Sequence, residues 1–381
     1  MSDRIIIKNG HVIDPANHID RVCDIEISDG KIYSIGEAGL CSNAVTIYAD
    51  GKYVVPGLID FHTHLFEGGS QFGFNADMLT PYGVTTCVDA GTAGSANYSC
   101  FHRNLVQKLP QIYTFLNISS MGQMGSGLNE NLNPDLVDEG AIRELISQYP
   151  EEIRGIKIRI SKSIVGAQGI APLRKALEVS ENLGLPVCVH STDPCIPMEE
   201  LADMLRPGDV LCHLYHGSGS TILNEDGAVK PEVIHAAQRG VWMDAANGRT
   251  NFSFSVAKRA IEQGFLPGII STDLTAATVS RGKMVRNLLF IMSKYLNLGL
   301  SLEKIVACVT EAPAQALGIE NERGTLAIGT TADAAILDVI DQDCEFLDSH
   351  GCAFPGTKMI SNLMTIQSGK IVFDSNQLKQ G

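Results

Sequence analysis

Short apolar runs recur along the middle of this 381-residue chain and predict buried strands. Most of them contain few polar residues, as is typical of parallel strands that are covered on both faces. The runs are 54–61, 84–89, 111–118, 156–160, 186–190, 210–214, 241–244 and 269–272. Helical patterns separate several of the runs, among them 172–183, 231–239 and 253–263. Strands that alternate with helices predict an α/β fold, a (β/α)8 TIM barrel over residues 56–322.

The two ends of the chain show a different pattern, with short strands and turn signals. Asn9-Gly10 and Asp29-Gly30 each predict a tight hairpin turn, because these residue types adopt positive φ readily. The stretch 29–33 near the N-terminus is similar to 368–372 near the C-terminus. Neither end alone could bury an apolar face. We therefore expect a small β-sandwich domain assembled from both termini, residues 1–55 plus 323–381.

Composition narrows the classes of protein that the chain can belong to. A net charge of -14 argues against nucleic-acid binding, which needs a basic face. The chain lacks an apolar stretch of the roughly 20 residues that span a membrane, and its start lacks the apolar core of a signal peptide. We expect no membrane partner. The ten cysteines are scattered singly, which predicts reduced thiols and a cytoplasmic location.

Ionisable residues stand at the ends of the predicted barrel strands, where a barrel gathers its functional groups. His62 and His64 close the first strand, and alternation places both imidazoles on one face, within reach of one metal ion. The later strands contribute Lys157, His190, His213 and Asp273. Imidazole and carboxylate ligands suit zinc, with manganese or iron as alternatives. The His62–His64 pair is a weak signal alone, but the combination predicts a metal site.

Lys157 lies between apolar Ile156 and Ile158 in a predicted core strand. Because burial of an unpaired ammonium is costly, this lysine either pairs with a carboxylate or is converted to an anion. Lys162 is a rival, but it lies beyond the apolar part of the strand. His216 is a rival to His213; it falls in the following loop, where it would support a ligand or contact substrate.

Several segments together resemble the amidohydrolase superfamily, over almost the whole chain. These segments are 55–64, 82–86, 155–157, 189–190, 271–273, 310–314 and 324–333. The resemblance implies that Lys157 is N-carboxylated and bridges two divalent metal ions. It also implies that His62, His64 and Asp273 complete one metal site, and that His190 and His213 complete the other. Asp273 would then act as a general base and afterwards as a general acid.

Within the superfamily, the segments 89–94, 156–166 and 271–275 resemble a deacetylase branch that is also labelled dihydroorotase-like or adenine-deaminase-like. That resemblance implies removal of an acetyl group from an N-acetyl or O-acetyl α-substituted carboxylate. The alternatives are a cyclic amidase of the dihydroorotase or hydantoinase kind, an adenine or purine deaminase, and a non-catalytic scaffold or regulator. One departure is Ala246-Asn247-Gly248, where the branch leads us to expect Gly-His-Gly.

The expected partner is a small molecule that carries a carboxylate. Arg159 and Arg249 are candidates to bind it, although each could instead form an ordinary surface ion pair. Backbone N–H groups at Gly91 and Thr92 could bind an anion or could form a plain turn. His216 and Asn247 are further candidates for substrate contact. A homo-oligomer is compatible with a barrel enzyme, although no interface is indicated.

Overall fold

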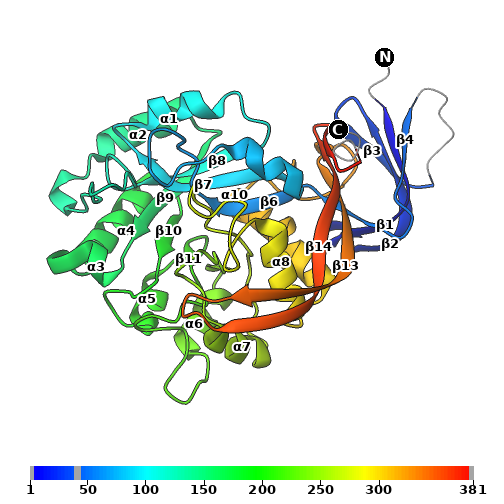
Figure 1. Cartoon of the computed structure of the whole chain (residues 1–381). Helices are drawn as coiled ribbons and strands as arrows, with labels where there is room; N and C mark the ends of the chain where they lie inside the picture. Colours follow the sequence, from blue (N-terminus) through cyan, green and yellow to red (C-terminus); the bar gives the residue numbers. More distant parts are fainter. Residues whose placement is uncertain (1–3, 38–43, 377–381) are drawn as a thin grey trace.

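The computed structural model describes residues 4–37 and 44–376, and in these the strands form two sheets (Figure 1). One sheet is seven-stranded and parallel, with its strands in chain order. Its strands are β6 (Leu58–Thr63), β7 (Val84–Gly94), β8 (Gln111–Asn117), β9 (Ile153–Arg159), β10 (Val187–His190), β11 (Val210–Cys212) and β12 (Trp242–Asp244). The predicted α/β barrel therefore has seven regular strands.

The eighth predicted strand, 269–272, is replaced by an irregular segment that occupies the same place. Ile269 forms a parallel bridge to Asp244 of β12, and Leu274 forms one to Thr63 of β6. The backbone N–H of Asp273 donates to the carbonyl of His62 at 2.8 Å. The segment thus joins the last regular strand to the first, and the fold is TIM-barrel-like.

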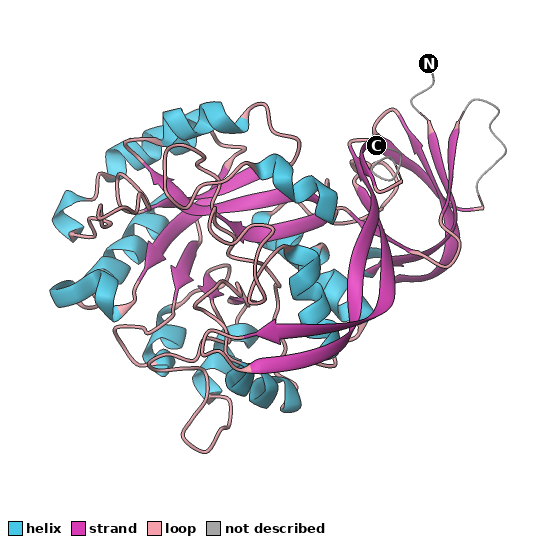
Figure 2. Cartoon of the chain, in the orientation of Figure 1, coloured by secondary structure: helices cyan, strands magenta, loops and turns pink. Residues whose placement is uncertain are grey.

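Helices cover the outside of this sheet (Figure 2). They are α1 (Tyr98–Leu105), α2 (Glu139–Gln148), α3 (Lys162–Val165), α4 (Ala171–Leu183), α5 (Met198–Met204), α6 (Pro231–Gln238), α7 (Phe254–Glu262), α8 (Leu288–Asn297), α9 (Leu302–Val309) and α10 (Glu311–Leu317), with 3₁₀ turns at Pro15–Asn17, Ala76–Tyr82, Pro134–Leu136 and Gly166–Gln168. In α4 the buried residues Leu173, Ala176 and Val179 recur at helical spacing and face the sheet. Gly184, with a φ of 66°, ends this helix. Within the described ranges, none of the helices has the length and apolarity that a membrane crossing requires.

Strands from both termini form the second, eight-stranded sheet. Its order is β15 (Lys370–Asp374), β14 (Ala353–Gln367), β13 (Ala334–Leu347), β5 (Tyr53–Pro56), β1 (Ile5–Asp14), β2 (Ile19–Ser28) and β3 (Lys31–Gly36), with β4 (Val45–Tyr48) paired to β1. Ile7, Val54 and Ile336 lie in one buried cluster, so the two ends share a core as expected. The more specific description of this region as a β-sandwich stays a prediction.

Two local predictions are wrong. The apolar run 54–61 is two strands, since β5 belongs to the end sheet and β6 to the barrel. Gly57 separates them, where a Cβ would lie 2.2 Å from the Thr85 hydroxyl oxygen. Asn9-Gly10 is a bulge inside β1 rather than a turn, because a residue with positive φ also suits a bulge. Asp29-Gly30 does turn β2 into β3, with φ values of 52° and 74°.

A long hairpin leaves the end sheet and lies across the barrel (Figure 1, orange to red). The sequence predicted strands only at 334–337 and 359–367, but β13 and β14 stay paired as far as Leu347 and Ala353. We call residues 338–362 the arm and residues 348–352 its tip. The arm packs on α8, where the Ser293 hydroxyl accepts a hydrogen bond from the backbone N–H of Ile360 at 2.8 Å. The end domain is thereby attached to the barrel.

Candidate metal centre

A cavity of about 340 Å³ lies at the ends of the barrel strands that the sequence singled out. His62, His64, Lys157, His190 and Asp273 all line it. Only the sixth predicted ligand is set back from the wall. His213 is fully buried, with its ring centroid 4.3 Å from that of His190 and 5.2 Å from that of His62. The fold therefore brings all six predicted ligands together.

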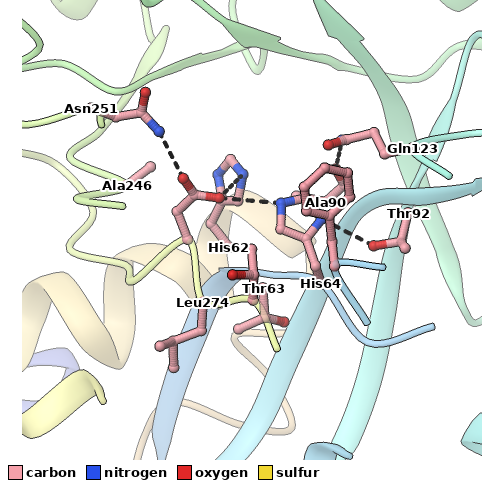
Figure 3. Close-up of polar contacts among 12 residues, drawn as sticks. His62, Thr63, His64, Ala90, Thr92, Gln123, Ala246, Asn251 and Leu274 are labelled. Atoms are coloured by element: carbon pink, nitrogen blue, oxygen red, sulfur yellow. Dashed lines mark hydrogen bonds and ion pairs between the residues drawn. The ribbon is translucent and has the colours of Figure 1, made fainter. Parts of the chain in front are cut away.

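His62 and His64 converge on one carboxylate oxygen (Figure 3). The Oδ1 atom of Asp273 lies 3.2 Å from His64 Nε2 and 3.6 Å from His62 Nε2. On its far side, His64 Nδ1 lies 3.0 Å from the Thr92 hydroxyl, which fixes the orientation of the ring. A nitrogen from each histidine and a carboxylate oxygen lie within 4.8 Å of one another. This spacing suits one metal ion bound by all three.

His213 is held in the state that a metal ligand requires. Its Nδ1 donates to the carbonyl of Ala246 at 2.7 Å, which leaves Nε2 with its lone pair. Nε2 is buried and has no hydrogen-bond partner among the described residues. Burial lowers the pKa of His213 to about 3, so the ring is neutral. A buried acceptor without a partner is costly unless a ligand such as a metal ion satisfies it.

The backbone at the site is also unusual. His213, Ala246 and Asp273 have φ values of 66°, 31° and 54°, although none is a glycine. Such conformations are unfavourable by roughly 1–3 kcal/mol each and are found where the surroundings impose them, often at functional sites. The strain falls on two predicted ligands and on the residue whose carbonyl orients one of them.

Lys157 is buried to 1% exposure and lacks an ion pair with any carboxylate that the structure describes. Its Nζ lies 3.4 Å from His62 Nε2, 3.5 Å from Cys188 Sγ and 3.8 Å from Cys212 Sγ. Gly91 packs against it, where a Cβ would lie 2.5 Å from Lys157 Cγ. Of the two readings of this buried lysine, pairing with a carboxylate is not observed. Lys162, the rival, is exposed and pairs with Asp193.

The donor set fits metal ions. It offers imidazole nitrogens and a carboxylate at the cavity, and the unsatisfied Nε2 of His213 lies buried behind them. His62, His64 and Asp273 would form one half of such a centre, and His190 and His213 the other. Lys157 lies beside His62 of the first half.

Asn251 is a residue that the sequence did not reveal. Its Nδ2 donates to Asp273 Oδ2 at 2.7 Å, so it holds the carboxylate oxygen that the histidines do not contact (Figure 3). Gly248 packs against the same oxygen, where a Cβ would lie 2.3 Å away. The unexpected Ala246-Asn247-Gly248 segment is thereby explained in part: the carbonyl of Ala246 orients His213, and Gly248 leaves room for Asp273.

Two further buried carboxylates were also missed. Asp60 accepts hydrogen bonds from the backbone N–H and hydroxyl of Thr272 at 3.1 and 2.7 Å. Asp244 accepts from the Ser271 hydroxyl at 2.6 Å and lies 3.4 Å from His62 Nδ1. Burial raises the pKa of Asp60 to about 7 and that of Asp244 to about 6. Both link the irregular eighth segment to its neighbouring strands, and the place of Asp244 at the end of β12 was the available signal.

The two predicted arginines differ. Arg159 donates to Glu130 Oε2 from its Nε at 2.6 Å, and the Glu130 side chain is almost fully buried. Arg249 lines the cavity, is exposed, and forms no ion pair with the residues that the structure describes. The guanidinium of Arg249 is therefore the one of the two that is free to bind an anion.

The remaining predicted substrate contacts are not among the residues that line the cavity, and their roles in substrate binding stay predictions. His216 is fully buried away from the cavity. Asn247 accepts a hydrogen bond from Lys294 Nζ at 3.3 Å and donates to the Tyr295 hydroxyl at 3.3 Å. Thr92 contacts His64, and its N–H donates to Asp89 Oδ1 at 2.7 Å. Gly91 packs on Lys157. These residues support the site and do not line it.

A TIM-barrel-like fold with imidazole, lysine and carboxylate groups at its strand ends defines a class, the metal-dependent hydrolases. The comparison with known families agrees. Residues 53–372 match the amidohydrolase family, and the chain belongs to that family. The predicted superfamily and enzyme class are confirmed: the protein is a metal-dependent hydrolase that acts on C–N bonds.

The curated relatives include three proteins named deacetylase. The chain is 34% identical to one from Brucella anthropi, with 88% of this chain and 84% of the relative covered. It is 34% identical to one from Agrobacterium fabrum, with 85% and 80% covered. It is 30% identical to one from Enterococcus faecalis, with 96% and 98% covered.

Solved structures show the same architecture. One described as an adenine deaminase is 30% identical, covers 97% of this chain and 99% of its own, and has a TM-score of 0.90. One described as a dihydroorotase is 30% identical, covers 98% of both chains, and has a TM-score of 0.89. A D-hydantoinase at 18% identity, with 97% and 95% covered and a TM-score of 0.66, shares the fold.

Proposed function

We propose that the protein is a deacetylase that hydrolyses an N-acetyl or O-acetyl α-substituted carboxylate. The observation that carries the proposal is the convergence of His62, His64 and Asp273 at the cavity, close to His213 with its buried, unpartnered Nε2. Three relatives named deacetylase, at 30–34% identity over most of the chain, support the substrate class.

In this proposal His62, His64 and Asp273 would hold one divalent metal ion and His190 and His213 a second, zinc with manganese or iron as alternatives, and an N-carboxylated Lys157 would serve as a shared ligand. When bound, the metal ions would supply Lewis-acid activation of the acyl carbonyl and of water. His62 and His64 would bind through Nε2, and His213 through the Nε2 that its bond to Ala246 leaves free.

Asp273 has the properties of the group that moves the proton. Burial raises the pKa of this carboxyl, but interactions with its neighbours, first of all the hydrogen bond with His64, together outweigh burial and hold it well below its usual range. The group is therefore ionised near neutral pH, and it would accept the proton of the activated water molecule. It would then donate that proton to the leaving group. Asn251 holds the other oxygen, so the carboxylate keeps one orientation through both steps.

Arg249 supports an anionic substrate. The guanidinium of Arg159 is already paired with buried Glu130, whereas Arg249 has a free guanidinium in the cavity wall. We propose that Arg249 binds the substrate carboxylate. This favours an acetylated carboxylate over a neutral purine, and it leaves a cyclic amidase acting on a ring with a carboxylate as the second candidate. The structural relative described as a dihydroorotase supports that alternative.

A substrate panel tests the proposal. The purified, metal-loaded protein is given N-acetyl D- and L-amino acids and O-acetyl hydroxy acids, and acetate release is measured. Dihydroorotate ring opening and ammonia release from adenine are measured alongside. Acetate release with a kcat/KM well above those for the other two reactions is expected. Preferred ring opening would replace the proposal with the cyclic amidase, and ammonia release would replace it with the deaminase. A protein that binds no divalent metal and hydrolyses none of these compounds would be a scaffold or regulator.

Arg249→Gln tests the anion contact. The variant should raise KM for carboxylate substrates about 10-fold or more, because a charge-assisted bond is lost, while kcat changes less. Arg143→Gln is the matched control, since Arg143 pairs with Glu139 on the outer surface of α2. An unchanged KM in Arg249→Gln would remove Arg249 from the binding site.

The domain organisation is part of the proposal. We assign the metal-binding catalytic barrel to 56–322 and a β-sandwich domain to 1–55 plus 323–381. The pairing of β5 with both β1 and β13 supports a shared end domain, with the proposed junction beside Gly57.

A further inference from the structure

The tip of the arm contacts the segment that forms one wall of the cavity. Asp348, at the tip, is only 2% exposed. Its Oδ1 accepts the backbone N–H groups of His350 and Cys352 at 2.9 and 2.8 Å, which closes the turn of the tip. Its Oδ2 accepts the N–H of Phe254, the first residue of α7, at 3.0 Å. One oxygen thus builds the tip, and the other binds the barrel.

Ser349 makes the complementary contact. Its backbone N–H and its hydroxyl both donate to the carbonyl of Phe252, at 2.9 and 2.7 Å. The ring of Phe354 in the arm packs against Phe254, with centroids 5.2 Å apart. The backbone polar groups on both sides of Ser253 are therefore held by the end domain.

The segment held in this way carries the contact to Asp273. Asn251 immediately precedes Phe252, and its Nδ2 donates to Asp273 Oδ2 at 2.7 Å. Its Oδ1 accepts the Thr192 hydroxyl at 2.9 Å, so the amide has one defined orientation. Arg249 and Thr250, the two preceding residues, line the cavity. A displacement of the backbone at 252–254 would move all three.

The arm also contacts a second segment that contributes to the cavity lining. The backbone N–H of Leu347 donates to the carbonyl of Lys283 at 2.8 Å, and the Lys283 ammonium pairs with Glu345 at 2.7 Å. Lys283 belongs to the stretch between Asp273 and α8, which supplies Thr275 and Thr278 to the cavity. One hairpin thus holds the segments that follow both the seventh and the eighth barrel strands.

We propose that Asp348 and Ser349 are positioning residues of the active site, which act through the segment 249–254 to keep Asn251 against Asp273. The inference rests on the proposed function, because Asp273 is the group that is positioned. It goes beyond that function by making the end domain, which contains none of the predicted ligands, a working part of the catalytic site.

Asp348→Asn separates the two contacts of this side chain. An asparagine keeps one acceptor oxygen, which can still close the turn of the tip, but its NH₂ cannot accept the N–H of Phe254. We expect faster amide hydrogen exchange in 249–254, and a loss of about 10-fold in zinc affinity and in kcat/KM, as when an outer partner of a ligand is removed. Asp138→Asn is the matched control, since Asp138 caps α2 away from the site.

A double-mutant cycle shows whether the arm acts through Asn251. Asn251→Ala should lower zinc affinity. Adding Asp348→Asn to it should lower the affinity little further, because the contact between Asn251 and Asp273 has already been lost. Asp138→Asn combined with Asn251→Ala should be additive. Unchanged exchange and zinc affinity in Asp348→Asn, or additive effects with Asn251→Ala, would overturn the proposal.

These readouts separate this proposal from the proposed function. Exchange and zinc affinity are measured with the full chain and zinc alone, without substrate. If they change as expected while no acetylated compound is hydrolysed, the deacetylase assignment fails and the positioning role of the arm remains. If acetate is released but Asp348→Asn matches the wild type in all three measurements, the positioning role fails and the deacetylase assignment remains.

Discussion

Within residues 4–37 and 44–376, two lysines are buried to 1% exposure or less, and their surroundings differ. Lys294, in α8, donates to the carbonyl of Met284 at 2.9 Å and to Asn247 Oδ1 at 3.3 Å. Its ammonium also lies 4.4 Å from the centre of the Phe252 ring. Lys157, in the cavity floor, has two thiols and an imidazole as its polar neighbours.

We infer from this difference that Lys294 has a structural role and that Lys157 takes part in the metal centre. Carbonyl oxygens and an aromatic face are good partners for an ammonium, so the packing around Lys294 accounts for it. Thiols are weak hydrogen-bond acceptors, and an imidazole nitrogen that binds a metal ion cannot also accept a hydrogen bond from Lys157. We propose that, with metal ions bound, the environment of Lys157 suits an anion better than it suits an ammonium. N-carboxylation would create that anion, and four predictions test the comparison.

Lys157→Ala should have the largest effect. Without the group between the two halves of the centre, we expect loss of most bound metal and a fall in turnover of about 10³-fold or more, the scale of losing a catalytic metal. Metal analysis and acetate release measure the two effects, and small carboxylates added to the variant should restore part of the activity. Lys162→Ala, at the exposed rival position, is the control. Wild-type metal content in Lys157→Ala would remove its bridging role.

Asp273→Asn should give the next largest effect, of another kind. An amide cannot take up the proton, so we expect kcat to fall by about 10²- to 10⁴-fold while KM changes little. The half of the centre that contains His190, His213 and Lys157 should still bind metal. If Asp273→Asn instead loses all metal, as Lys157→Ala is expected to do, the two variants do not distinguish proton transfer from metal binding. An unchanged kcat would exclude Asp273 as the proton carrier.

Removal of carbon dioxide and bicarbonate from the wild type should have a smaller effect. If Lys157 must be carboxylated before the second half of the centre forms, metal loading of the metal-free protein should slow by about 10-fold and recover when bicarbonate is added. The zinc content after a fixed loading time measures this. Lys294 has no neighbouring metal ligands within the described part of the chain and should not be carboxylated. Metal loading of the Lys157→Ala variant, which retains Lys294, should therefore not depend on bicarbonate. Equal loading rates with and without bicarbonate would contradict carboxylation.

Much of the ligand set could be predicted because its signals are local. Alternation places His62 and His64 on one face, and a charged residue between Ile156 and Ile158 is unusual in a core strand. The eighth strand was predicted from its apolar residues, yet 269–272 is irregular. There, side-chain hydrogen bonds replace part of the regular backbone hydrogen-bond ladder. Asp60 accepts from Thr272, and Asp244 accepts from Ser271.

The supporting residues could not be predicted because their partners are distant in sequence. Asn251 lies in a stretch without periodicity, and its backbone neighbours are held by Asp348, almost a hundred residues later. The sequence gives no measure of how far β13 and β14 stay paired, so the arm was missed. For the same reason the sequence could not show that His216 is fully buried or that Asn247 bonds to Lys294, because both depend on packing between distant segments.

Lys294→Met should have the smallest effect, on stability and not on metal content. Burial lowers the pKa of Lys294 to about 7, although the charge of Asp348 opposes this. An unfolded lysine keeps its proton to a pH of about 10.4, so between these values the unfolded chain binds more protons and the wild type gains stability as the pH rises. Methionine has no such proton. The stability of Lys294→Met relative to the wild type should therefore be greatest at or below about pH 7, and should then decrease by at most about 1.4 kcal/mol per pH unit.

Denaturant unfolding at several pH values measures this, with Lys258→Met as the control at a partly exposed ring contact. A difference that does not depend on pH would show that Lys294 keeps its proton in the folded state. The contrast with Lys157 would then rest on their neighbours alone.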